Sequence, residues 1–152
     1  MKNENQEANL QIGILNPNEG HVLDNVAEGV FDYPIDHRWF VEFLNDPRHH
    51  LAVAIDDQQV VGMASSVDYV HPDKAPELWI NEVGVAPSHR GRGVASQLLR
   101  CLFQHGLTLG CKQAWVLTES NNSAARNLYV RAGGKKSDET PVCFSFYLDS
   151  ES

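Results

Sequence analysis

The stretch Arg90-Gly91-Arg92-Gly93-Val94-Ala95-Ser96 decides the fold, because its two glycines separate an apolar run from a helical pattern. Glycine allows the backbone to approach a ligand closely, and the start of a helix offers free amides and the positive end of its dipole. A diphosphate is the natural ligand of such a turn. The alternative interpretation is a tight turn that binds nothing.

The patterns on either side of this turn predict one mixed α/β domain. Strands are expected over residues 10–15, 51–55, 60–67, 78–85, 114–118 and 142–148. Helices are expected over residues 16–31, 37–44, 93–110 and 122–132. The front half is antiparallel, whereas a doubly wound sheet alternates strand and helix throughout. Simple alternation along the strand 78–85 places Trp79, Asn81 and Val83 on one face, and Ile80, Glu82 and Gly84 on the other.

The composition of the chain excludes several classes of partner. Its net charge is −8, which disfavours nucleic acid and attracts cationic substrates, although acidity also serves solubility alone. No apolar run approaches the ~20 residues that cross a bilayer, so no membrane partner is expected. The polar residues 1–9 are interpreted as a flexible tail, without a secretory signal, before a domain over residues 10–149. Three cysteines without a C-x-x-C pair indicate free thiols in the cytoplasm and no metal site.

Three nucleotide chemistries compete for the glycine turn. A P-loop is excluded because the chain has no Gly-x4-Gly-Lys-Ser/Thr string. A dinucleotide fold has partial support, since Gly91-x-Gly93 is present and Glu119 follows a strand where a ribose-binding acid is expected. Ser96 occupies the third glycine position, however, and only one further strand and helix follow. Acyl-CoA is the third chemistry.

The residues around and beyond the turn resemble the Gcn5-related N-acetyltransferase (GNAT) superfamily. Its turn, Arg/Gln-x-x-Gly-x-Gly/Ala, is matched by Arg90, Gly93 and Ala95, and its preceding pattern Glu-hydrophobic-x-Val-x-Pro is matched by residues 82–87. Its downstream motif Asn-x-x-Ala-x-x-Leu-Tyr-x-x-x-Gly is matched by Asn122, Ala125, Leu128, Tyr129 and Gly133. The resemblance spans residues 10–148. Gly134 departs from it, because the family usually has an aromatic or aliphatic residue there.

The resemblance implies a single GNAT-type α/β (α+β) domain and acetyl-CoA as the acetyl donor, without a metal. The expected sheet is mixed, has about six to seven strands, is flanked by about four helices, and is splayed between strand 78–85 and strand 114–119. Backbone groups of two valines would pair with the pantetheine arm, and the turn would hold the pyrophosphate. The donor-binding residues implied are Val83, Val85, Arg90, Gly91, Arg92, Gly93, Val94, Ala95, Ser96, Asn122 and Ala125.

Attack of an amine on a thioester requires a neutral amine, a polarised carbonyl and a proton for the departing thiolate. Tyr129 is predicted to be the acid. Glu82 is predicted to be the base, directly or through water, because it lies at the splay among apolar neighbours and is expected to be partly desolvated. Two alternatives stay open: Tyr129 as an aromatic that only packs, and Glu82 as an acid that only binds a substrate cation.

The layout of residues 27–82 resembles the small aminoglycoside 3-N-acetyltransferases, which implies a cationic acceptor such as gentamicin and a role in antibiotic resistance. Acidic side chains would recognise its ammonium groups. The predicted substrate-binding residues are Asp32, Asp36, Glu77, Glu82, Glu119 and Asp138.

Several alternatives to that acceptor remain. They are a GNAT enzyme acting on a polyamine, an amino acid or a protein N-terminus, and a non-catalytic acyl-CoA sensor. Family members often dimerise through their C-terminal strands, and the apolar stretch 142–147 permits a homodimer.

Overall fold

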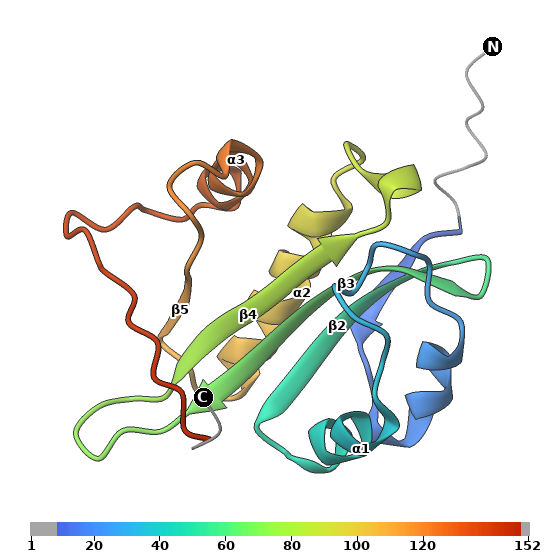
Figure 1. Cartoon of the computed structure of the whole chain (residues 1–152), viewed down its shortest axis with the longest axis horizontal. Helices are drawn as coiled ribbons and strands as arrows, with labels where there is room; N and C mark the ends of the chain where they lie inside the picture. The colour runs from blue at the N-terminus through green and yellow to red at the C-terminus, as the bar shows by residue number, and fades with distance from the viewer. Residues whose placement is uncertain (1–8, 150–152) are drawn as a thin grey trace.

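The computed structural model describes residues 9–149 and contains one five-stranded sheet in the order β1-β2-β3-β4-β5 (Figure 1). The strands are β1 (Gln11–Ile14), β2 (His49–Asp56), β3 (Gln59–Tyr69), β4 (Glu77–Val85) and β5 (Gln113–Val116). The first four pair antiparallel, and β5 joins β4 in parallel. The described helices are the 3-10 helices η1 (Pro17–Asp24) and η2 (Pro87–His89), and the α-helices α1 (His37–Asn45), α2 (Val94–Thr108) and α3 (Ser123–Arg131). The predicted mixed α/β domain with an antiparallel front half is therefore confirmed.

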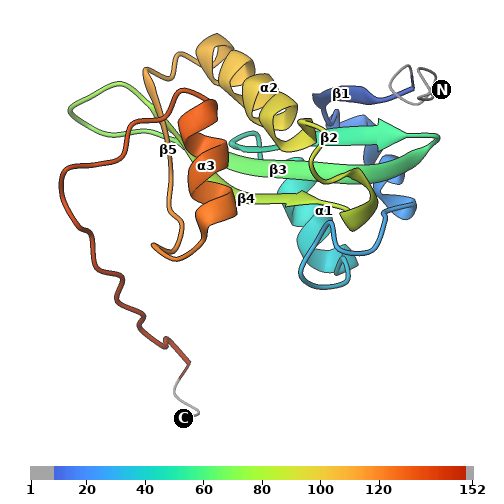
Figure 2. The same cartoon turned by 90° about the horizontal axis from the view of Figure 1, so that it is seen from above.

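The core lies between α2 and the face of the sheet against which it packs. The helix α1 lies on the opposite face of the sheet (Figure 2). Val94, Leu98 and Leu102 recur at helical spacing along α2 and are at most 2% exposed. The helix packs so closely that a Cβ added at Gly62 on β3 would meet Val94 Cγ1 at 3.1 Å and Leu98 Cδ1 at 3.2 Å. This packing fixes the start of α2 against the sheet, at the end where the glycine turn lies.

Strand β4 changes face at a β-bulge. Ser66 of β3 pairs with Ile80 while Ser65 pairs with Glu82, so Asn81 is the extra residue. Because paired residues share a face, Val83 joins Ile80 on the side of α2, and Glu82 joins Trp79 on the opposite side. The face assignment predicted by simple alternation is therefore wrong beyond Asn81.

The sheet splays where expected. Pairing between β4 and β5 covers only residues 77–80 and 113–116, after which the chain leaves the sheet and Leu117 is 60% exposed. The stretch 81–85 of β4 therefore has a strand neighbour on the β3 side alone. The predicted splay between these two strands is confirmed.

Two predicted elements differ from the structure. The first helix was expected to reach residue 31 but ends at Asp24, because Val26 then forms a β-bridge with Val60 and Gly29 has a φ of +86°. The stretch 142–148 is not a strand, because no described strand pairs with it, and the sheet has five strands instead of six to seven. The predicted tail over residues 1–9 lies, apart from Asn9, outside the described residues.

Candidate active site

A cleft of about 940 Å³ opens at the splay. One wall is the unpaired end of β4, the floor is the glycine turn with the first turn of α2, and the other wall is α3, which faces the end of β4 (Figure 1). The predicted site residues among its lining are Asp32, Glu82, Val83, Val85, Arg90, Gly91, Gly93, Val94, Ala95, Ser96, Asn122, Ala125 and Tyr129. The fold thus gathers into one cleft most of the residues that the two motifs singled out.

The glycine turn has the geometry of an anion cradle. Gly91 and Gly93 have φ values of +74° and +75°, in the left-handed region that side chains disfavour. Gly93 is the N-cap of α2 and brings no side chain, so the first amides of the helix are left without an intrahelical acceptor. Nothing lies within 4 Å of a Cβ built at either glycine, and both line the cleft. The turn therefore offers open backbone donors and the positive end of α2 to an anion.

Arg90 ties the turn to β4. Its Nε donates to the carbonyl oxygen of Val85 at 3.0 Å, which links the cradle to the last residue of the open strand. His89 supports the same corner, since its Nε2 lies 2.7 Å from Asp56 Oδ2. These contacts fix the distance between the anion cradle and the free edge of β4.

Two carboxylates face the cleft, Glu82 from β4 and Asp32 from the loop before α1. That loop lies directly on β4, because a Cβ added at Gly84 would stand 2.0 Å from the carbonyl oxygen of Val30. Both acids are exposed, so the predicted partial desolvation of Glu82 is wrong: the bulge turns its side chain away from the α2 face of the sheet. They give the lining of the cleft two negative charges.

Tyr129 lies on α3, which Asn122 caps by accepting from the amide of Ala125 at 3.1 Å. The tyrosine is half-buried, and burial raises the pKa of its phenol, which stays protonated at neutral pH. The helix ends in a Schellman motif, in which Gly133 has a φ of +93° and Gly134 N donates to Tyr129 O at 2.9 Å. A Cβ at Gly134 would lie 2.9 Å from that oxygen, which explains why glycine stands there.

Other predicted site residues lie away from the cleft. Asp36 caps α1, its Oδ1 accepting from the amide of Arg38 at 3.0 Å. Glu77 starts β4 and accepts from Tyr69 and His71, at the opposite end of the strand from the splay. Glu119, Asp138 and Arg92 are exposed and do not line the cleft. Asp36 and Glu77 are therefore engaged by local hydrogen bonds, and the other three charged residues lie outside the cleft lining.

The cleft also contains residues that the sequence reasoning did not assign to it, among them Gly29, Val30, Met63, Leu128 and Arg131. Leu128 belongs to the downstream motif, so its position in the cleft lining could have been predicted from the sequence. Val30 and Met63 carried no such signal, because Val30 reaches the cleft through the contact of the loop before α1 with β4, and Met63 through the pairing of β3 with β4. Arg131 adds a positive charge on the α3 wall.

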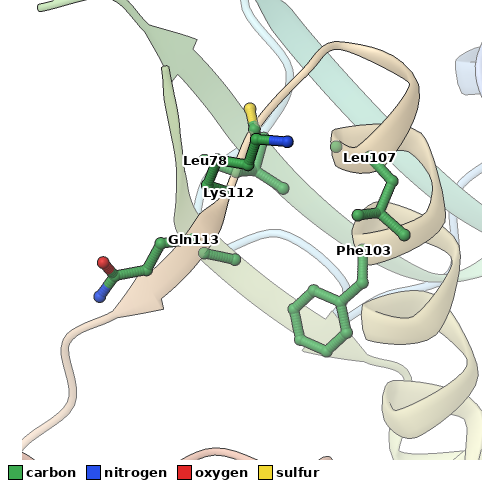
Figure 3. A pocket seen from close by; sticks show the side chains of 8 residues that line it. Leu78, Phe103, Leu107, Lys112 and Gln113 are labelled. Atoms are coloured by element: carbon green, nitrogen blue, oxygen red, sulfur yellow. The ribbon is translucent and has the colours of Figure 1, made fainter. Parts of the chain in front are cut away.

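A second, smaller pocket of about 200 Å³ lies between α2 and the start of β5 (Figure 3). Leu78, Phe103 and Leu107 line it, so it is mainly apolar. Cys111 also lines it, and burial raises the pKa of this thiol, which keeps it protonated. The pocket holds none of the predicted site residues.

The chain was compared with known protein families, curated proteins and solved structures. Residues 21–134 match the sequence profile of the acetyltransferase (GNAT) family. The chain belongs to this family. This GNAT chain is 31% identical over 119 residues to the aminoalkylphosphonate N-acetyltransferase of Salmonella typhimurium, and the match covers 76% of each protein. It is 30% identical over 95 residues to the aminoglycoside N(6′)-acetyltransferase type 1 of the same organism, covering 59% of this chain and 66% of that one.

The fold is that of solved GNAT structures. The structure of the aminoglycoside N-acetyltransferase AAC(6′)-Iy in complex with CoA superposes with a TM-score of 0.75 at 22% identity, covering 92% of this chain and 95% of that one. The matches to the first curated relatives cover 54% to 66% of their length. Over residues 9–149, no helix is long and apolar enough to cross a membrane, and no three His, Cys, Asp or Glu side chains group as metal ligands. The predicted superfamily is confirmed.

Proposed function

We propose that this GNAT enzyme transfers the acetyl group of acetyl-CoA to an amine of a small cationic substrate, with an aminoglycoside as the favoured acceptor. One observation carries the proposal: a single cleft joins the left-handed glycine turn to the carboxylate of Glu82 and the phenol of Tyr129. The domain over residues 10–149 would contain the whole active site.

The cleft suits the donor. Open amides at the start of α2 fit a pyrophosphate, and the free backbone edge of β4 at Val83 and Val85 fits the amide groups of a pantetheine arm. Asn122, Ala125 and Ser96 line the same cleft. When bound, acetyl-CoA supplies a thioester carbonyl and a thiolate leaving group.

The chain supplies the proton transfers. Tyr129 keeps its proton because burial raises its pKa, and it is the only tyrosine among the cleft-lining residues that the structure describes, so it serves as the acid. Glu82 is exposed and carries no ion pair or hydrogen bond among the described residues, so it is available to accept a proton from the acceptor or to hold its ammonium group. Asp32 adds a second anion to the lining of the cleft.

The acceptor is inferred from charge and from relatives. The net charge of −8 and the two cleft carboxylates favour a polycation over an anionic amine such as an aminoalkylphosphonate. One relative is named as an aminoglycoside N(6′)-acetyltransferase, whereas the sequence layout resembles 3-N enzymes. Acetylation of the 3-amino group, and through it antibiotic resistance, is the expectation that product analysis must decide.

The test is release of free thiol from acetyl-CoA with a panel of amines: gentamicin, spermidine, an aminoalkylphosphonate and an N-terminal peptide. We expect gentamicin to be acetylated fastest, and NMR of the product to place the acetyl group on one amine. Glu82→Gln should reduce turnover strongly, whereas Glu119→Gln, which changes an exposed acid outside the cleft, should not. Turnover of spermidine without gentamicin would rule out the aminoglycoside, and CoA binding without turnover of any amine would favour a sensor.

We further propose that the enzyme is a homodimer in the cytoplasm. Val142, Phe144, Phe146, Tyr147 and Leu148 are each at least 77% exposed in the segment after α3, more apolar surface than one stretch of a monomer ordinarily leaves in water. The edge strand β5 has no described partner on its outer side. Sedimentation should give a dimer, and F144S with F146S should give a monomer; equal masses for both forms would exclude this interface.

A further inference from the structure

Two tryptophans stack on the face of β4 and β5 opposite α2. Trp79 of β4 and Trp115 of β5 are register partners, their ring centroids 5.2 Å apart and their planes inclined by 4°. Both remain partly exposed. The helix α2 packs behind β4, and no helix of the described chain lies over the front of β4 and β5 (Figure 1). The pair thus forms an aromatic surface open to a ligand.

A polar network holds this pair in place. Trp115 Nε1 donates to Tyr69 Oη at 2.8 Å, and Tyr69 Oη donates to Glu77 Oε2 at 3.0 Å. The ring of His71 lies 2.8 Å from the same oxygen through Nε2, and hydrogen bonds from Tyr69 and His71 lower the pKa of Glu77. Glu77 therefore stays an anion and fixes Trp115 through Tyr69, which gives a partly exposed indole one defined orientation.

The bulge at Asn81 brings this aromatic pair and the carboxylate of Glu82 onto one face. In a regular strand Trp79 and Glu82 would point to opposite faces, since they are three residues apart. With the extra residue they share the face opposite α2, about 10 Å apart along the strand. Glu82, which lines the cleft, therefore lies on the same face of β4 as Trp79, which does not line it.

We propose that the Trp79–Trp115 pair binds a ring of the acceptor, an amine-bearing sugar, while Glu82 binds or deprotonates the reacting amine. This inference rests on the proposed function and names its substrate class. An indole attracts a cation to its face and buries the apolar face of a ring, and the nearby carboxylates match the ammonium groups. A linear polyamine has no ring to stack, so the pair selects ring-bearing amines. Glu77 and Tyr69 are positioning residues that act through Trp115.

The kinetic test compares ring-bearing and linear acceptors. Trp79→Ala and Trp115→Ala should each raise KM for gentamicin by about tenfold, in line with the loss of an aromatic contact with a ring of the acceptor. KM for spermidine, which loses only a cation–π contact, should rise less, and KM for acetyl-CoA should stay unchanged. Trp79→Phe should restore part of the affinity. Trp39→Phe is the matched control, because Trp39 lies on α1 and is 58% exposed.

A binding test needs no turnover. In the Trp39→Phe protein the remaining emitters are Trp79 and Trp115. Titration with gentamicin should shift their emission more than titration with spermidine does. Tyr69→Phe should change the emission maximum of the free protein and raise KM for gentamicin without altering kcat, as expected of a positioning residue.

The outcomes separate this inference from the function on which it rests. Gentamicin acetylated with the same KM by both alanine variants overturns the ring site and leaves the proposed function intact. An equal loss with gentamicin and spermidine also overturns it, because the stack would then only support the fold. An emission shift without acetylation of any amine overturns the proposed function instead.

Discussion

The two ends of the sheet treat their charged groups in opposite ways. At the splayed end, Glu82 is exposed and unpaired within the described chain. At the other end, His50 Nε2 lies 2.6 Å from Asp68 Oδ1, and His105 Nε2 lies 2.9 Å from His50 Nδ1. Arg48 adds an ion pair of 3.5 Å to the same aspartate. The charges of the closed end hold the strands and α2 together, whereas Glu82 and Asp32 at the splayed end have no ion-pair partner among the described residues.

Strand β4 shows the same contrast within nine residues. Glu77 at its start is held by Tyr69 and His71, while Glu82 beyond the bulge has no such partner. Both were predicted to bind substrate, Glu77 as one of several acids near the rim and Glu82 also from its position at the splay. In β4 an acid is available to a ligand where the sheet opens and is held by neighbouring side chains where the strands stay paired.

Gly93→Val should have the largest effect. Valine is strained at a φ of +75°, and the turn can relieve that strain only by moving the amides of the cradle. Loss of two charge-assisted hydrogen bonds corresponds to a fall in CoA affinity of about a hundredfold or more. Calorimetry with CoA measures it.

The matched control is Gly110→Val, which meets the same strain at a φ of +84° at the far end of α2, with open space around its Cβ. It should lower the melting temperature comparably and leave CoA affinity intact. Equal CoA affinity in the two variants would show that the glycine turn does not bind CoA.

Tyr129→Phe should reduce kcat by about a hundredfold, the lower range for loss of a general acid. KM for acetyl-CoA should change little, because the ring still packs against the core. Tyr147→Phe, an 88% exposed tyrosine outside the cleft, is the control. An unaltered kcat in Tyr129→Phe would leave this residue with a packing role only.

Gly84→Ala should separate the loop before α1 from β4. The added Cβ would stand 2.0 Å from the carbonyl oxygen of Val30, so the loop that carries Asp32 must move. Crowding of this kind costs about 1–3 kcal/mol of stability, and the displaced carboxylate should raise KM for the cationic acceptor. Thermal unfolding and acceptor kinetics measure both effects. Gly13→Ala, where no atom lies within 4 Å of the new Cβ, should alter neither.

The sequence predicted most of the fold and most of the residues that line the cleft, because those features are local. The glycine turn and the helix that carries Tyr129 each depend on residues within one turn or helix. The face of Glu82 could not be predicted, since the bulge at Asn81 is a property of the pairing between β3 and β4. The place of Glu77 depends on side chains of Tyr69 and Trp115, which only the folded sheet brings together.

The smallest expected effect concerns the closed end, where pH should act through His105. The pKa of His105 is lowered, first by burial and then by the neighbouring His50, while Asp68 acts in the opposite direction. Between that lowered value and the ordinary value near 6.5, the unfolded chain binds a proton that the folded chain does not. The free energy of unfolding therefore falls as the pH drops below about 6.5, and it rises again towards neutral pH.

His105→Gln should flatten this acid limb, because the amide can still donate to His50 without taking up a proton. Since the side chain is partly exposed, the difference in unfolding free energy between pH 7 and pH 5 should shrink by less than about 1 kcal/mol. Urea unfolding at several pH values measures it, with His21→Gln, an exposed histidine on η1, as the control. CoA affinity should stay constant throughout, because the two ends of α2 serve different tasks. A parallel loss of CoA binding would show that the closed end also controls the cleft.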